Sequence, residues 1–244
     1  MAAREEEMLG WKRLEQGQLD RAEGHFRRSL EMDPDRVEAL NGLGQVYMAW
    51  DELDEAAELF QMALAIAEPN LPRGKRRTGW HDPHVRPYLR SLHLLAMTRI
   101  RRGAYQSAAE PLETMLAWDA TGVDGEAYLL LGQCRQRLGE VEVADACYEK
   151  ARLKHPHAWY LYGLTRLLLG HGPDAVHCFK AAVDVVPEVA PLLAFYPRVR
   201  GIGGEGAPRH RQAVQFVNAT VDLFTRESRE LLRSLMTGEV ASAQ

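Results

Sequence analysis

Two apolar-periodic stretches joined by a short turn recur along most of this chain, and this repetition restricts the fold more than any other feature. A small alanine in the second stretch marks each copy. Ala22 and Ala56 are 34 residues apart, and Ala144 lies 36 residues after Ala108 and 31 before Ala175. The interval between Ala56 and Ala108 fits one copy plus about 18 inserted residues. Because the apolar residues have helical spacing, the sequence predicts five helix-turn-helix hairpins.

The copies also carry the residues that closely packed antiparallel helices need. Small residues let the two helices approach, and an aromatic side chain fills the groove toward the next hairpin. These aromatic residues are Phe26, Phe60, Tyr148 and Phe179. Glycine, which tolerates a left-handed backbone, ends the first helix of four copies, at Gly17, Gly103, Gly139 and Gly170. Each hairpin leaves an apolar face that a stacked neighbour buries.

The small residues, the aromatic residue and the closing prolines Pro34, Pro156 and Pro187 resemble the tetratricopeptide repeat (TPR) family. The resemblance covers residues 2–187. It implies an all-α, right-handed solenoid of about five hairpins that binds another protein or a peptide without catalysing a reaction. Lysine, asparagine and arginine form the family's clamp for chaperone tails. Glu7, Trp11 and Gly42 stand at several of those positions here, which argues against that ligand.

Residues 69–87 interrupt the period with four prolines and two glycines, so we expect an inserted loop there. The sequence from Trp80 through Arg90 is similar to bacterial repeat proteins of the suppressor-of-tumorigenicity type, which implies no established chemistry. A basic cluster in the loop could contact a phosphate or a nucleic acid, and an accessory or regulatory subunit of that kind is the alternative function. The cluster consists of Arg73, Lys75, Arg76 and Arg77.

The sequence after Pro187 predicts a terminal cover for the stack. We expect a linker over 188–206, with glycines at 201, 203, 204 and 206, then closing helices over 207–236 and disorder over 237–244. Two roles remain open for the closing helices. They could cap the last hairpin, or they could fold back and fill the inner groove, because Tyr160, Leu164, Leu167 and Leu168 make that end apolar.

Composition limits the remaining function classes. A net charge of −4 disfavours a general nucleic-acid binder, so we do not expect that partner. The absence of an export signal or a long apolar run predicts a cytoplasmic protein with no membrane partner.

Three widely spaced cysteines, Cys134, Cys147 and Cys178, suggest free thiols rather than a metal site. We expect no cofactor, and we expect His81, Asp82 and His84 to be loop residues rather than a catalytic or metal-binding group.

The repeat period turns one stripe of each first helix toward the inner groove, where we expect the partner to bind. Aromatic and arginine side chains dominate the energy of many interfaces, and arginine pairs with carboxylates, so an acidic peptide is a reasonable partner. The predicted contacts are Trp11, Asn41, Gln45, Arg90, His93, Met97, Arg101, Gln133, Arg137 and Tyr160. The sequence does not indicate the oligomeric state.

Overall fold

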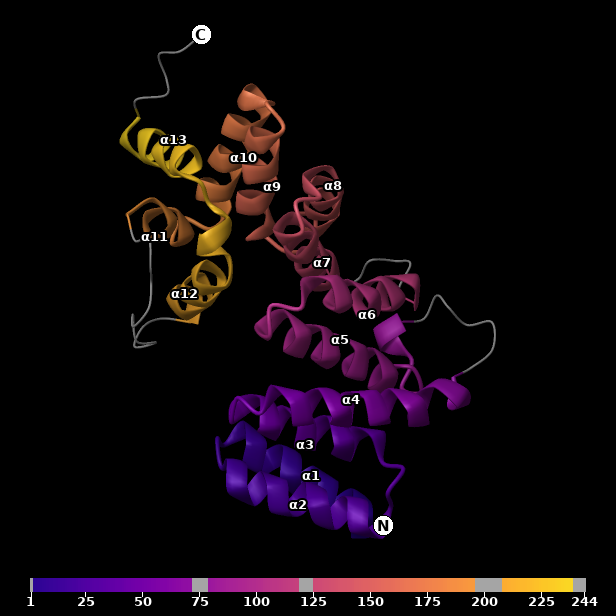
Figure 1. Ribbon diagram of the computed structural model, residues 1–244. Helices are drawn as coiled ribbons and strands as arrows, with labels where there is room; N and C mark the ends of the chain where they lie inside the picture. The colour runs from indigo at the N-terminus through magenta and orange to yellow at the C-terminus, as the bar shows by residue number, and fades with distance from the viewer. Residues whose placement is uncertain (1, 72–78, 119–124, 196–207, 239–244) are drawn as a thin grey trace. The chain divides into compact units, whose positions relative to one another are not determined.

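The computed structural model describes residues 2–71, 79–118, 125–195 and 208–238. Within these ranges the regular structure is entirely helical, which confirms the predicted all-α class (Figure 1). The chain divides into two compact units, residues 1–123 and 124–244, which we describe separately and call unit 1 and unit 2.

Unit 1 contains three hairpins, in which each odd-numbered helix packs against the helix that follows it. The helices are α1 (Ala2–Glu15), α2 (Leu19–Met32), α3 (Val37–Ala49), α4 (Leu53–Ala67), α5 (Arg86–Arg101) and α6 (Tyr105–Trp118). The short 3-10 helices η1 (Glu68–Asn70) and η2 (Gly79–His81) lie between α4 and α5. The first helices α1, α3 and α5 also contact one another in order. Stacking of hairpins therefore brings together side chains that are about 40 to 50 residues apart in sequence.

Unit 2 contains two hairpins followed by the closing segment. The hairpins are formed by α7 (Gly125–Arg137) with α8 (Val141–Ala151) and by α9 (Ala158–Leu168) with α10 (Gly172–Val185). The closing segment consists of α11 (Val189–Phe195), α12 (Pro208–Thr220), the 3-10 helix η3 (Val221–Leu223) and α13 (Arg226–Thr237). The observed helix α11 corrects the expected linker over 188–206. Its apolar side chains Val189 and Leu193 are fully buried, so this stretch belongs to the core.

The predicted contact between aromatic and small residues is present in the hairpins. The Phe26 ring lies against Gly10 of its own hairpin and against Gly42 of the next one. Tyr148 has the same relation to Gly132, where an added Cβ would lie 2.5 Å from the Tyr148 ring. Real Cβ atoms do not approach other heavy atoms so closely, so the ring occupies the space that only glycine leaves open.

The turns between the paired helices follow the prediction, with one substitution. Gly17, Gly103, Gly139 and Gly170 have φ of 70°, 75°, 82° and 81°. The second hairpin has Asp51 at φ 66° in the corresponding turn. Asp is among the few residues other than glycine that enter this region at modest cost, so the turn is retained without a glycine.

The boundaries of the insertion also differ from the expected range of 69–87. Gly79 and Val85 are buried, and α5 begins at Arg86. The last residues of the range therefore belong to the third hairpin rather than to a surface loop. The basic cluster of the insertion falls in 72–78, outside the described residues. The expectation of disorder over 237–244 concerns mostly residues that also lie outside them, although Thr237 is the last residue of α13.

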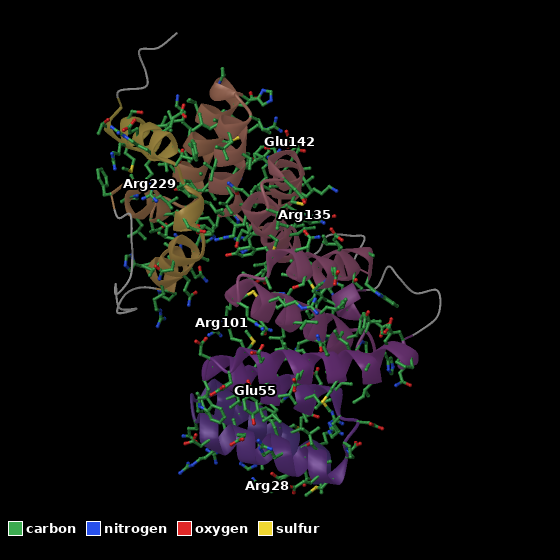
Figure 2. The ribbon with its side chains drawn as sticks, in the orientation of Figure 1. Arg28, Glu55, Arg101, Arg135, Glu142 and Arg229 are labelled. Atoms are coloured by element: carbon green, nitrogen blue, oxygen red, sulfur yellow. The ribbon has the colours of Figure 1, made fainter. Side chains whose placement is uncertain are left out.

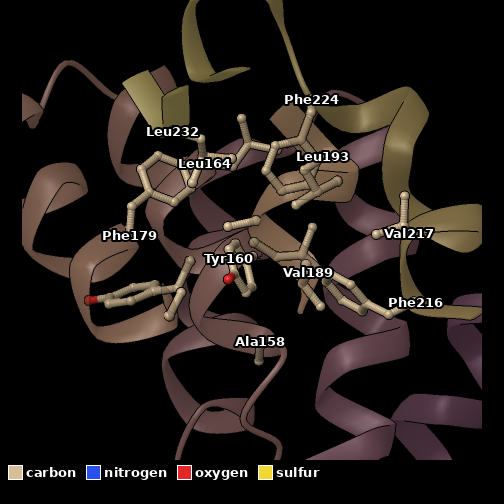
Figure 3. Close-up of a cluster of buried hydrophobic side chains, with 14 of the residues drawn as sticks. Ala158, Tyr160, Leu164, Phe179, Val189, Leu193, Phe216, Val217, Phe224 and Leu232 are labelled. Atoms are coloured by element: carbon tan, nitrogen blue, oxygen red, sulfur yellow. The ribbon is translucent and has the colours of Figure 1, made fainter. Parts of the chain in front are cut away.

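The largest buried apolar cluster joins the hairpins of unit 2 to the closing segment (Figure 3). Tyr160 and Leu164 of α9 lie in the same cluster as Phe216 and Val217 of α12. Leu232 of α13 is also fully buried in it. The closing segment therefore covers the apolar side of α9, the first helix of the last hairpin. It also ends the stack.

Candidate peptide-binding surface

The first helices of unit 1 contact one another in order, and we call the exposed side of α1, α3 and α5 the first-helix face. The predicted residue on α1 is Trp11, those on α3 are Asn41 and Gln45, and those on α5 are Arg90, His93, Met97 and Arg101. All but Asn41 are at least partly exposed. The structure thus brings six of these seven predicted contacts to one side of unit 1.

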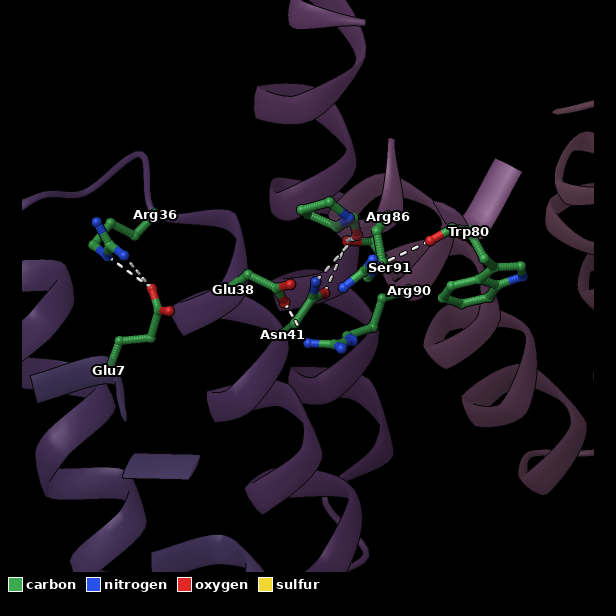
Figure 4. A network of polar contacts seen from close by, with 9 residues as sticks. Glu7, Arg36, Glu38, Asn41, Trp80, Arg86, Arg90 and Ser91 are labelled. Atoms are coloured by element: carbon green, nitrogen blue, oxygen red, sulfur yellow. Dashed lines mark hydrogen bonds and ion pairs between the residues drawn. The ribbon is translucent and has the colours of Figure 1, made fainter. Parts of the chain in front are cut away.

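Arg90 connects all three first helices. Its Nη1 donates to Glu38 Oε2 of α3 at 2.8 Å (Figure 4). Its guanidinium carbon lies 5.3 Å from the centroid of the Trp11 ring of α1. The Trp11 ring in turn meets the buried Phe26 ring edge to face at 5.4 Å. These contacts orient Trp11 and Arg90 within unit 1.

Asn41 is a correction to the predicted contacts. Its side chain is completely buried, because α5 packs directly over it. The Asn41 Nδ2 donates to the Pro87 carbonyl at 3.3 Å, and its Oδ1 accepts from Ser91 Oγ at 2.8 Å (Figure 4). The Asn41 amide thus joins two hairpins and cannot meet a partner.

Arg101 lies at the C-terminal end of α5 and also has internal partners (Figure 2). Its guanidinium donates to the Met48 carbonyl at 2.7 Å and to Asp51 Oδ1 at 2.6 Å. The two arginines expected to attract an acidic peptide, Arg90 and Arg101, are therefore already paired with carboxylates of unit 1. Their charges are largely balanced within the protein.

Two residues of this surface were not predicted. Met8 of α1 is 54% exposed and lies three residues before Trp11, which places it on the same side of the helix. Glu38 faces Arg90, as described above. The helical spacing from Trp11 to Met8 was a signal in the sequence. The position of Glu38 one turn before Asn41 gave no comparable sign that it would neutralise Arg90.

The predicted contacts in unit 2 are occupied by the protein's own chain. Tyr160 is fully buried, its hydroxyl donates to the Val186 carbonyl at 2.8 Å, and its ring lies 6.3 Å from that of Phe216 (Figure 3). Gln133 is 5% exposed. Arg137 donates to the Ala219 carbonyl and to the Asp222 carboxylate of the closing segment. All three side chains were predicted to face a partner, and the closing segment takes that place at Tyr160 and Arg137.

The residues considered for catalysis or metal binding form a local turn. The backbone N–H of His84 donates to Asp82 Oδ1 at 2.9 Å, and His81 and His84 are both exposed. Among the residues that the structure describes, no group of three or more histidine, cysteine, aspartate or glutamate side chains is arranged to hold a metal ion. Cys134, Cys147 and Cys178 are buried free thiols. Burial raises the pKa of both Cys134 and Cys178 to about 11.

No helix in the described part of the chain combines the length and apolar character needed to cross a bilayer.

Stacked hairpins in which the same spacing between a small and an aromatic residue recurs define an α-helical repeat protein. The tetratricopeptide repeat signature matches residues 7–70 and again residues 126–158. These two stretches therefore carry tetratricopeptide repeats, as the sequence predicted.

Several solved structures of low sequence identity share this fold. A crystal structure of MamA is 22% identical, with a TM-score of 0.60 over 78% of this chain and 94% of that one. MamA from Desulfovibrio magneticus RS-1 is 16% identical, with a TM-score of 0.61 over 75% of this chain and 94% of that one. YrrB, described as a TPR protein with an unusual peptide-binding site, is 20% identical, with a TM-score of 0.56 over 73% of this chain and 83% of that one.

One curated relative also matches this chain by sequence. The RNA polymerase-associated protein CTR9 of Caenorhabditis elegans is 23% identical over 184 residues, or 70% of this chain. The match spans only 14% of that relative. The chain therefore spans only a small part of that relative's length.

Proposed function

We propose that this protein is a non-enzymatic interaction scaffold that binds a peptide or protein segment on the first-helix face of unit 1. The observation that carries the proposal is the Trp11–Arg90–Glu38 group, in which Arg90 contacts both of the other side chains. Gln45 and Met97, two turns further along α3 and α5, are partly exposed. The family favours this role, because its fold serves mainly in protein interactions. The description of YrrB as having a peptide-binding site is a further reason to expect a peptide.

The chemistry of the surface favours a partner with apolar anchors over a strongly acidic one. Arg90 and Arg101 already have carboxylate partners, so an acidic peptide would have to compete with Glu38 and Asp51. Met8 of α1 and Met97 of α5 offer flexible apolar side chains on the same first helices, and both are at least partly exposed. Methionine adapts to differently shaped side chains, so these residues suit a segment that inserts one or two apolar residues.

The test begins with a peptide library selected on the full-length protein. The affinity of the selected peptides is then measured for Met97→Asp and for Met62→Asp. Met62 is a matched control, because it is 53% exposed on the second helix α4 of the same unit. We expect Met97→Asp to weaken binding about tenfold or more, which corresponds to the loss of one apolar anchor. Met62→Asp should change it less than about twofold.

Circular dichroism and thermal unfolding of both variants establish that each remains folded. Equal peptide affinity of the wild type and Met97→Asp would place the interaction elsewhere. Equal loss in both variants would show that the effect is one of charge or stability, and it would also contradict the proposal.

A further inference from the structure

The helix α13 carries three arginines on one face. Arg226, Arg229 and Arg233 are separated by three and then four residues, so they project from the same side of the helix. Together with Glu230 they line an open hollow of about 370 Å³ (Figure 2 labels Arg229). Three guanidiniums and one carboxylate give this hollow a formal charge of +2, whereas the whole chain has a net charge of −4.

Arg229 is held at the base of the hollow by backbone carbonyls. Its Nε donates to the Phe224 carbonyl at 3.2 Å, its Nη1 to that of Leu193 at 3.4 Å, and its Nη2 to that of Val221 at 2.8 Å. These acceptors are partial charges, and no carboxylate of the described residues forms an ion pair with Arg229. Burial and the neighbouring Arg233 lower the pKa of Arg229, in keeping with a cation whose charge is not balanced.

Arg233 is similarly short of a negative partner. It donates through Nε to the Ala194 carbonyl at 2.9 Å, and its guanidinium carbon lies 5.7 Å from the centroid of the Phe195 ring. Because a guanidinium has five N–H donors, the donors on Nη1 and Nη2 remain for a ligand. Within the part of the chain that the structure describes, no acidic side chain lies within ion-pair distance of Arg233. Arg226 pairs with Glu230 at 2.7 Å through Nε, which also leaves its Nη donors.

Capping alone does not account for this arrangement. The carbonyls of Leu193 and Ala194 lie at the end of α11, and arginines commonly bond such carbonyls. That role uses Arg229 and one donor of Arg233, but it gives no reason for a third arginine, Arg226, on the same face. The contrast with the hollow beside α9 is informative, because Arg166 there pairs with Asp145 at 3.0 Å.

We propose that the hollow on α13 binds a phosphate group. A single guanidinium fork satisfies a carboxylate, whereas three guanidiniums around one hollow suit an anion with more oxygens and more than one negative charge. The site belongs to unit 2 and is separate from the peptide surface of unit 1. It can therefore operate whether or not that surface binds a partner.

The experiment titrates the full-length protein with inorganic phosphate at constant ionic strength and follows the side-chain Nε–Hε NMR signals of arginine. We expect saturable shifts in the signals of α13. Arg226→Gln combined with Arg233→Gln should weaken binding about tenfold or more, because charge-assisted hydrogen bonds are lost. The matched control replaces Arg209 and Arg211 of α12, two exposed arginines of the same unit, with Gln and should change binding less than about twofold.

Glu230→Gln provides a test in the opposite direction. It removes the carboxylate that competes for Arg226, so phosphate should bind about threefold more tightly. A purely structural role for the arginines predicts no gain, and this variant decides the question if the double variant proves misfolded. Non-saturable shifts in the wild type would overturn the proposal, and so would an unchanged phosphate affinity in Glu230→Gln. An equal loss of phosphate affinity in the double variant and in the control would also overturn it.

Two further titrations define the ligand. Acetate binding as tight as phosphate binding would overturn the assignment to phosphate. O-phosphoserine serves as a phosphate monoester. If it binds more tightly than inorganic phosphate, the site takes a phosphoryl group on a larger molecule, and if it binds more weakly, the site takes the free ion. Both of these outcomes support a phosphate site.

Discussion

Arg137 of α7 forms a bidentate ion pair with Asp222, a residue 85 positions later in the chain. Its Nη2 donates to Asp222 Oδ1 at 2.8 Å and its Nε to Asp222 Oδ2 at 3.1 Å, while Nη2 also reaches the Ala219 carbonyl at 2.7 Å. The Arg137 side chain is only 11% exposed. This contact joins the end of α12 and η3 to α7, the first helix of the fourth hairpin.

Removing this contact should loosen the closing segment. Arg137→Ala eliminates charge-assisted hydrogen bonds from a mostly buried site, and we expect a loss of about 2 kcal/mol in the free energy of unfolding. Asp222→Ala should cost less, about 1 kcal/mol, because its carboxylate is 58% exposed. Urea denaturation measures both losses, and amide hydrogen exchange should show faster exchange in α12.

The exposed pair of Arg226 and Glu230 provides the comparison for this prediction. Arg226→Ala, measured without phosphate, should leave the unfolding midpoint unchanged. If α12 amides exchange as slowly in Arg137→Ala as in the wild type, the ion pair does not hold the segment in place.

The close contact of Gly132 with Tyr148 predicts a strong effect of a single methyl group. In Gly132→Ala the new Cβ would lie 2.5 Å from the ring, so the hairpin must separate or the ring must move. We expect a loss of about 1–3 kcal/mol, which is typical of overpacking.

Gly172→Ala is the matched control in the same unit. Gly172 is the first residue of α10, and nothing lies within 4 Å of its added Cβ. This variant should be neutral or stabilised by up to about 1 kcal/mol, because alanine favours the helix. Thermal unfolding compares the two. A Gly132→Ala protein as stable as Gly172→Ala would mean that the contact is looser than the structure indicates.

The sequence predicted the hairpins because their determinants are local and periodic. The spacing of Gly132 and Tyr148 repeats in other copies, so one copy supports the interpretation of the next. The contact between Arg137 and Asp222 has no such repetition. It joins a repeat to a segment outside the period, and nothing in either neighbourhood indicates the other.

The predicted contact residues differ in how far the folded hairpins leave them exposed. Asn41 lies on the expected stripe, yet its short side chain is covered when α5 packs on α3. Arg90 is exposed as expected, but the period carried no information on whether Glu38 would neutralise it. Periodicity thus assigns a side chain to a face, whereas its availability depends on neighbours that only the folded hairpins bring together.

The buried cysteines should be slow to react in the folded protein. Because burial raises the pKa of Cys134 and Cys178 to about 11, their thiolate fractions at about pH 8 should be lower by about a hundredfold than for an ordinary thiol. Alkylation with iodoacetamide followed by mass spectrometry should show little modification of these two residues until a denaturant is added. All three cysteines should then react. Rapid labelling of Cys134 under native conditions would show that its burial is transient.

The docking of α12 should weaken in acid because of His157. The His157 ring lies 5.1 Å from that of Phe216 of α12, and its Nε2 is buried without a hydrogen-bond partner. Burial, with a smaller effect of His155, lowers the pKa of His157, whereas Glu188 opposes the shift. The unfolded chain then binds the proton more readily than the folded one. The stabilising contribution is fully present above the unfolded pKa of about 6.5 and is lost as the pH falls below it.

Thermal unfolding at about pH 7.5 and about pH 5.5 measures this dependence, because the two values lie on either side of that pKa. The midpoint of the wild type should fall on acidification, and His157→Leu, which cannot be protonated, should reduce the fall. His171→Leu is the control, since His171 is exposed at the N-terminal end of α10. It should retain the wild-type dependence. If His157→Leu loses as much stability on acidification as the wild type, the pH dependence arises from other groups, and the contact between His157 and Phe216 does not make the closing segment sensitive to protons.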